Sequence, residues 1–147
     1  MGPTPHIHTI ARAASAAILG IAVLCGGCGG SPQIVDHPAY PASAPRGPTL
    51  DIQVVRRGAA IELTNTTAQA IGPSTLWLNG RYGRDIGPLG VGQSRRLDLR
   101  EFVDQWGDRF RAGGFFATEL RERLVKAELQ PQGGGPMLGL VVIRESE

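Results

Sequence analysis

Two cysteines near the start of the chain have a spacing that could support redox or metal chemistry. Cys25 and Cys28 are separated by two glycines, the C-x-x-C spacing found in thiol–disulfide and zinc sites. Redox pairs of this kind lie at the start of a helix inside a folded domain, whereas this pair follows an apolar run and precedes a proline-rich stretch. His6, His8 and His37 have no zinc-ligand spacing to the cysteines. The sequence therefore predicts no metal site and no cofactor.

Four carboxylates form a second group of chemically interesting residues: Asp98, Glu101, Asp104 and Asp108. Two carboxylates can hydrolyse a glycosidic bond, one as acid and the other as base or nucleophile. Glu101 and Asp104 would share one face of a helix. Helix capping, solvation and pairing with neighbouring arginines explain the same residues without catalysis, so we expect no catalytic residue.

Two other kinds of active site are disfavoured by the residues present. After residue 27 the only histidine is His37, which lies in the proline-rich stretch, and this nearly excludes a serine–histidine hydrolase. Residues 87–94 are rich in glycine but lack the Gly-Lys-Ser/Thr ending of a phosphate loop. Pro88 also removes one backbone donor. A turn between strands is the simpler interpretation.

Aromatic and arginine side chains near a predicted hairpin could bind peptide or glycan. The Asn-Gly pair at 79–80 is a strong signal for a two-residue turn, which places Trp77 opposite Tyr82 on one face. The neighbouring leucines would face the core, so the aromatic pair would face outward or toward a short helix. The alternative is that these aromatics, with Trp106, fill the core or cover its edge. The candidate contact surface consists of Trp77, Tyr82, Arg81 and Arg84.

The first 28 residues have the features of an export signal. Arg12 precedes a 12-residue apolar run at 13–24, and the small residues Gly26 and Gly27 stand immediately before Cys28. A membrane-spanning helix needs about 20 apolar residues. An uncleaved membrane anchor is therefore the weaker alternative.

This arrangement resembles the signal of a bacterial lipoprotein. In that family a diacylglycerol thioether forms on the cysteine, and cleavage leaves this cysteine as the new N-terminus. The resemblance implies that Cys28 is lipidated; the position three before it, usually Leu or a similar aliphatic residue, is Cys25 here. The two or three acyl chains of such a terminus give stable anchoring. The implied location is the cell envelope, with the protein held at a membrane by its lipid and facing the periplasm or the exterior.

Composition and proline spacing divide the chain into three parts. Residues 28–147 number 120, enough for one domain with a proper core. The formal charge of +2 falls to +1 when Arg12 is removed, and interspersed charges leave no electrostatic footprint for nucleic acid. Closely spaced prolines predict an extended linker. We expect a signal peptide at 1–27, a lipidated N-terminus and linker at 28–48, and a folded domain at 49–147.

Within the domain, short alternating runs separated by turn residues predict strands rather than long helices. Asp98 and Glu101 have capping-box spacing and predict one or two helical turns. Phe110 and residues 115–116 are expected in a strand or loop that covers one end of the core. The last strand is a continuous apolar run, typical of a central strand buried on both faces. The expected strands cover residues 50–54, 61–64, 75–78, 81–86, 95–99, 124–129 and 138–143.

About seven strands with turn signals every eight to twelve residues predict an all-β fold. We expect an antiparallel β-sandwich with immunoglobulin-like layers and one short helical insertion, with a small barrel as the main alternative.

The predicted function is a lipid-anchored cell-envelope protein whose non-enzymatic β-sandwich acts as a structural or protein-binding module. The alternative is an envelope enzyme that acts on glycan through the carboxylates near the short helix. The expected partners are the membrane, through the N-terminal lipid, and another envelope protein or glycan, with no nucleic acid.

Overall fold

The computed structural model describes residue 2, residues 37–114 and residues 117–143. This part of the chain is almost entirely β-structure, with one short 3-10 helix, η1 (Leu99–Glu101). The predicted all-β fold with about seven strands and a short helical insertion is confirmed. In chain order the strands are β1 (Arg46–Arg57), β2 (Ala60–Asn65), β3 (Ser74–Leu78), β4 (Tyr82–Ile86), β5 (Ser94–Asp98), β6 (Ala127–Pro131) and β7 (Met137–Ile143).

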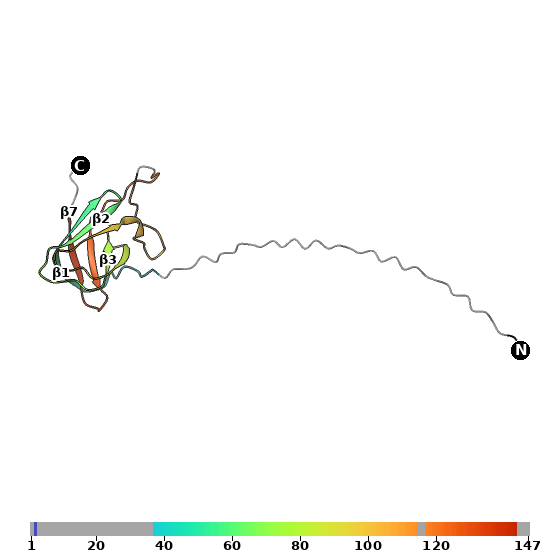
Figure 1. The fold of residues 1–147 in the computed structure, drawn as a ribbon, viewed down its shortest axis with the longest axis horizontal. Helices are drawn as coiled ribbons and strands as arrows, with labels where there is room; N and C mark the ends of the chain where they lie inside the picture. Colours follow the sequence, from blue (N-terminus) through green and yellow to red (C-terminus); the bar gives the residue numbers. More distant parts are fainter. Residues whose placement is uncertain (1, 3–36, 115–116, 144–147) are drawn as a thin grey trace. The chain divides into compact units, whose positions relative to one another are not determined.

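The seven strands form a single sheet in the order β4-β3-β6-β7-β1-β2-β5, which curls into a half-barrel (Figure 1). Five neighbouring pairs are antiparallel, but β1 and β7 run parallel. The sheet is therefore mixed, and the prediction of a wholly antiparallel arrangement is wrong at this pair. Apolar alternation has the same period of two in both kinds of strand, so the sequence pattern carried no information on the relative direction of β1 and β7.

Irregular pairing along β1 accounts for the curl of the sheet. Between Thr49 and Gln53, β1 advances by four residues while β7 advances by only two, from Gly139 to Val141. Extra residues on one strand bend it and increase its twist. Pro48 lies in a second irregular stretch, between Arg46 and Thr49, ahead of the residues of β1 that pair with β2. Its missing N–H therefore costs no hydrogen bond to β2.

The chain after β5 crosses the open side of the half-barrel. Asp98 caps helix η1 with its side chain, as the sequence predicts. Leu99 and Phe102 are fully buried, and Val103 then exchanges two backbone hydrogen bonds with Gly83 of β4 at 2.8 and 3.2 Å. The short helix thus belongs to a bridge between the two edge strands, β5 and β4.

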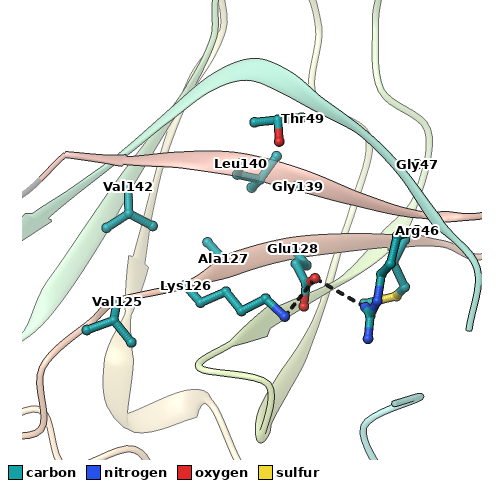
Figure 2. A pocket seen from close by; sticks show the side chains of 11 residues that line it. Arg46, Gly47, Thr49, Val125, Lys126, Ala127, Glu128, Gly139, Leu140 and Val142 are labelled. Carbon is teal, nitrogen blue, oxygen red and sulfur yellow. Dashed lines mark hydrogen bonds and ion pairs between the residues drawn. The ribbon is translucent and has the colours of Figure 1, made fainter. Parts of the chain in front are cut away.

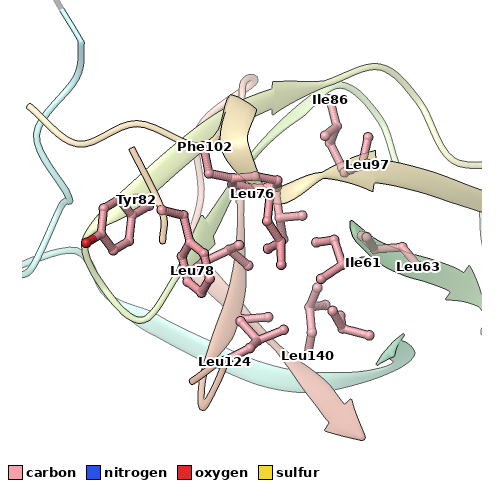
Figure 3. Packing of buried hydrophobic residues seen from close by; sticks show 14 of the residues in the cluster. Ile61, Leu63, Leu76, Leu78, Tyr82, Ile86, Leu97, Phe102, Leu124 and Leu140 are labelled. Atoms are coloured by element: carbon pink, nitrogen blue, oxygen red, sulfur yellow. The ribbon is translucent and has the colours of Figure 1, made fainter. Parts of the chain in front are cut away.

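One hydrophobic core fills the concave side of the sheet and takes side chains from both halves of it (Figure 3). Burial of each leucine or isoleucine side chain contributes about 1.5–3 kcal/mol relative to exposure. Phe110 is buried in this core, in agreement with the prediction, whereas residues 115–116 lie outside the described residues. The strand predicted at 124–129 begins at Ala127, with Leu124 buried ahead of it. Further members of the core are Ile52, Val54, Ile61, Leu63, Leu76, Leu78, Leu97 and Leu129.

Strand β7 occupies the middle of the sheet, but the prediction that it is buried on both faces is wrong. Leu140 belongs to the core, while Val141 and Ile143 are 36% and 39% exposed. Because the sheet curls around a single core, only its concave face meets that core. The apolar run of β7 therefore leaves hydrophobic side chains on the convex face.

The hairpin between β3 and β4 forms at the predicted Asn-Gly turn, with a different register. Both residues at 79–80 have left-handed φ angles, 54° and 66°, which a type I′ turn requires. Leu78 pairs with Tyr82, so the loop contains three residues rather than two. Trp77 consequently lies opposite Gly83 and not opposite Tyr82. The predicted pairing is wrong by one residue.

The folded domain begins earlier than residue 49. Strand β1 starts at Arg46, and the ring of Tyr40 packs edge-on against Trp77 with a centroid distance of 5.5 Å. Tyr40 and Arg46 both fall within the stretch predicted to be a linker. Residues 37–45 form no helix, as the proline spacing predicts, but their side chains contact the sheet.

We predict that Gly83→Ala destabilises the domain because Trp77 occupies the space that a side chain would need. A Cβ at Gly83 would lie 2.8 Å from the indole ring, which is itself only 1% exposed. Overpacking of this kind costs about 1–3 kcal/mol, measurable as a lower urea midpoint. The matched control is Gly72→Ala, where a Cβ meets no atom within 4 Å. Equal midpoints for the two variants would contradict the packing described for Trp77.

Candidate functional site

Trp77 and Tyr82 do not form a joint exposed surface. They are 1% and 2% exposed, and they lie on opposite faces of the sheet. A register change of one residue moves a strand's side chains to the other face, and the three-residue loop imposes that change on β4. Tyr82 therefore joins the core, and Trp77 lies on the convex face beneath Tyr40. The prediction that the two aromatics share an outward face is wrong.

Tyr82 is a buried hydrogen-bond donor at the edge of the core. Its ring packs edge-on against Phe110 at a centroid distance of 5.3 Å, and its hydroxyl donates to Glu122 at 2.9 Å. Figure 3 shows the hydroxyl directed away from the surrounding leucines. Burial, followed by the hydrogen bond to Glu122, raises the pKa of Tyr82 to about 12. The phenol is therefore neutral over the physiological pH range and serves a structural role.

The two arginines of the predicted contact surface meet the predicted carboxylates. Arg84 forms an ion pair with Glu101 of helix η1. Nη2 of Arg81 lies 2.6 Å from Oδ2 of Asp104 and 3.0 Å from Oδ2 of Asp108. The sequence indicates both sets of residues separately, and the structure brings them together where the chain after η1 pairs with β4.

Asp104 organises the loop at residues 104–108. Its side chain is 1% exposed; Oδ1 accepts the backbone N–H groups of Trp106 and Asp108, each at 2.9 Å, and Oδ2 accepts Nε of Arg81 at 2.8 Å. Burial opposes ionisation, but the hydrogen bonds from Arg81 and the two amides outweigh it and hold the pKa of Asp104 below its usual value. A catalytic acid for glycan hydrolysis needs the opposite shift.

Trp106 is the exposed aromatic residue that this loop presents. It is 74% exposed, and Cζ of the Arg81 guanidinium lies 5.9 Å from the centroid of its ring. The backbone N–H of Gly107 donates to the carbonyl of Asp104 at 3.0 Å, closing the turn beneath the indole. The hydrogen-bonded loop thus presents to solvent a large apolar side chain that contributes little to the core.

A second polar cluster surrounds Glu128 on the convex face. Its carboxylate is 7% exposed and accepts hydrogen bonds from the Tyr40 hydroxyl at 2.6 Å and from Arg46 at 3.1 Å, and Nζ of Lys126 forms an ion pair with it at 3.0 Å. Hydrogen bonds to Glu128 and then to Tyr40 raise the pKa of Lys126. No local sequence signal indicates this cluster, because Tyr40 and Arg46 lie in the proline-rich stretch predicted to be a linker.

A hollow of about 460 Å³ opens beside this cluster (Figure 2). Arg46 lies at one end of it, Val125 and Val142 lie at the other, and Lys126 and Glu128 lie between them. Its lining combines two cations and one carboxylate with aliphatic side chains. The lining residues are Arg46, Gly47, Thr49, Val125, Lys126, Ala127, Glu128, Met137, Gly139, Leu140 and Val142.

The predicted lipidation site, Cys28, lies outside the described residues, as do Cys25, Arg12 and the apolar run at 13–24. In the described part of the chain, no helix has the length and apolar character needed to cross a membrane. The same residues contain no group of three or more histidine, cysteine or acidic side chains arranged to hold a metal ion.

Comparison with known proteins identifies no relative: no family, no curated protein sequence and no solved structure matches this chain.

We predict that Asp104→Asn lowers the free energy of unfolding by about 2–4 kcal/mol at neutral pH, because it removes a buried, fully hydrogen-bonded charge. The native pKa of Asp104 is lowered, so its contribution is complete above the ordinary value of 3.8 and is lost as the pH falls through the native value. The difference in free energy of unfolding between Asp104→Asn and the unmodified protein should therefore become smaller toward about pH 3. Urea unfolding of both proteins at neutral pH and at about pH 3 measures this difference.

The matched control for this pH experiment is Asp51→Asn on β1, where the aspartate is exposed. It should change stability by no more than about 0.5 kcal/mol at either pH. A loss for Asp104→Asn that is the same at neutral and acidic pH would contradict the role given to the ionised carboxylate.

Proposed function

We propose that the protein is a lipid-anchored component of a bacterial cell envelope and that its β domain binds another envelope protein without catalysing a reaction. The anchoring half of this proposal rests on the sequence. Arg12, the apolar run at 13–24 and the small residues before Cys28 form a lipoprotein-type signal. Cleavage and acylation at Cys28 would leave the domain attached to a membrane, facing the periplasm or the exterior.

The binding half of the proposal rests on one observation, the exposure of Trp106 on a fixed loop. Tryptophan and arginine are enriched among the few residues that dominate binding energy at protein interfaces. Trp106 is 74% exposed beside Arg81, and the hydrogen bonds of Asp104 already order the loop. A partner would therefore bury the indole without having to order the loop at the same time.

We also propose that the domain is best grouped with two-layer β architectures. The β1–β2–β5 half of the sheet supplies Ile52, Leu63 and Leu97 to the core, and the β4–β3–β6 half supplies Leu76 and Leu129. The two halves thus share one interior, as the layers of an immunoglobulin-like sandwich do. The continuous mixed sheet distinguishes this domain from a standard sandwich.

The alternative function, glycan hydrolysis by the carboxylates near η1, has weaker support. Asp104 has both oxygens engaged and a lowered pKa, and Asp108 and Glu101 are ion-paired with arginines. The lowered pKa keeps Asp104 ionised at neutral pH, so this carboxylate lacks the proton that a general acid must supply.

The anchoring proposal predicts that Cys28→Ala abolishes incorporation of a clickable fatty acid in the bacterium that produces the protein. The thioether needs the sulfur atom of residue 28, so no acylated species should remain. Cys25→Leu is the matched control, because it removes the other cysteine and installs the aliphatic residue usual for the family at this position. Equal labelling of the Cys28→Ala variant and the unmodified protein would refute the anchoring proposal.

The binding proposal predicts that a photo-crosslinking amino acid at position 105 captures a discrete envelope protein from intact cells. Introducing Trp106→Ala into the same protein should remove most of that adduct, since loss of an interface tryptophan costs about 2 kcal/mol or more, roughly a 30-fold loss of affinity. The control crosslinker replaces Val91, which is 59% exposed on a different loop. An equal adduct from position 91, or an adduct that survives Trp106→Ala, would contradict the role of Trp106.

A further inference from the structure

The hollow beside Glu128 exists because β6 and β7 separate. Only two residue pairs join these strands, Glu128 with Gly139 and Leu129 with Leu138, although β7 continues to Ile143. Beyond these pairs, residues 125–127 line one side of the opening, and Leu140 and Val142 line the other. Gly139 also lines the hollow, and a Cβ there would lie 2.8 Å from Oγ1 of Thr49, another lining residue.

The polar end of the hollow carries an excess of positive charge. Arg46 and Lys126 both pair with Glu128, so two cations face one carboxylate. Glu128 already interacts with three donor groups, including the Tyr40 hydroxyl, so its negative charge is balanced without a cationic ligand. Arg46 and Lys126 have 42% and 49% exposed side chains. A guanidinium has five N–H donors and an ammonium has three, so both cations can bind a further acceptor while they keep Glu128.

The other end of the hollow is aliphatic. Val125 is 57% exposed, and Val142 and Leu140 line the space next to it. Figure 2 shows Val125 and Val142 together at the end opposite Arg46, with the amine of Lys126 between the two ends. A ligand would therefore meet cations at one end and apolar surface at the other.

We propose that this hollow binds a small organic carboxylate that carries a short aliphatic group. The carboxylate would accept hydrogen bonds from Arg46 and Lys126, and the aliphatic group would cover Val125 and Val142. The volume of about 460 Å³ falls within the range of small-molecule sites, about 300–1,000 Å³. The hollow and the Trp106 loop belong to different elements, so this inference stands independently of the proposed protein partner.

Two sources could supply this ligand chemistry, a free short-chain acid and the C-terminal end of a peptide. Titrations with hexanoate and with N-acetyl-glycyl-leucine, followed by amide NMR, separate them. The full chain would carry Cys28→Ala so that no detergent competes for the aliphatic probes. We expect both carboxylates to shift the amides of Lys126 and Gly139, with tighter binding by whichever probe resembles the natural ligand. Hexylamine and the amide of the dipeptide should bind at least 10-fold more weakly, the loss expected when a charge-assisted contact is removed.

Substitution of Lys126 and of Val125 tests whether these lining residues bind hexanoate. Lys126→Gln should weaken hexanoate binding about 10-fold, and Val125→Ser should weaken it severalfold by reducing apolar contact. Val125 is exposed, so its replacement leaves the fold intact even if Lys126→Gln disturbs the Glu128 cluster. The matched control, Arg96→Gln on β5, removes the same charge from an exposed strand position.

Three outcomes would overturn the proposal. Binding of hexylamine as tight as that of hexanoate would assign the site to cations through Glu128. Arg96→Gln could weaken hexanoate binding as much as Lys126→Gln, which would reduce the effect to net charge. An absence of shifts at Lys126 and Gly139 with both carboxylates would leave the hollow without this ligand. None of these results bears on the crosslinking experiment at the Trp106 loop, so the two proposals can fail separately.

Discussion

Strand β1 holds the two halves of the sheet on one core. It pairs with β2 on one side and with β7 on the other, and its irregular register with β7 lets it bend between them. Residues 29–147 contain no cysteine, so no disulfide can replace this connection. Burial of residues such as Ile52 and Val54, both fully inaccessible, therefore depends on β1 keeping its curvature.

Two buried carboxylates organise the convex face and the open side of this curled sheet. Asp104 orients Arg81 and orders the loop beneath Trp106, while Glu128 holds Arg46 and Lys126 at the edge of the hollow. A buried charge is costly unless its partners are held in good geometry. Each carboxylate thus holds its cationic partners at the surface of the domain, where their remaining donors face solvent.

Much of the fold could be predicted from the sequence because it depends on local signals. The period-two alternation located the strands, the Asn-Gly pair located the β3–β4 hairpin, and Asp98 located helix η1. The hairpin register could not be predicted, because one extra loop residue leaves the local pattern almost unchanged yet moves Tyr82 to the other face. The parallel pairing of β1 with β7 is likewise set by packing across the whole domain.

The candidate surfaces are harder to predict from the sequence, because they depend on contacts between residues far apart in the chain. Arg81 and Asp104 are each prominent in the sequence, but nothing local indicates that the chain after η1 pairs with β4 and brings them together. Glu128 occupies an alternating position that ordinarily faces solvent, and its covering residue, Tyr40, is 88 residues earlier in the chain. Proline content made that earlier stretch resemble a spacer, although its side chains complete the outer face.

The position of Tyr40 has a mechanical consequence. A pulling force that enters the domain at residue 37 reaches the Tyr40 ring, wedged between Trp77 and the cations, before it reaches the first backbone hydrogen bonds of β1. The ring contact and its hydroxyl bond to Glu128 would give way first and lengthen the connection by a few residues. The hydrogen bonds of β1 therefore carry the load only after this outer contact has separated.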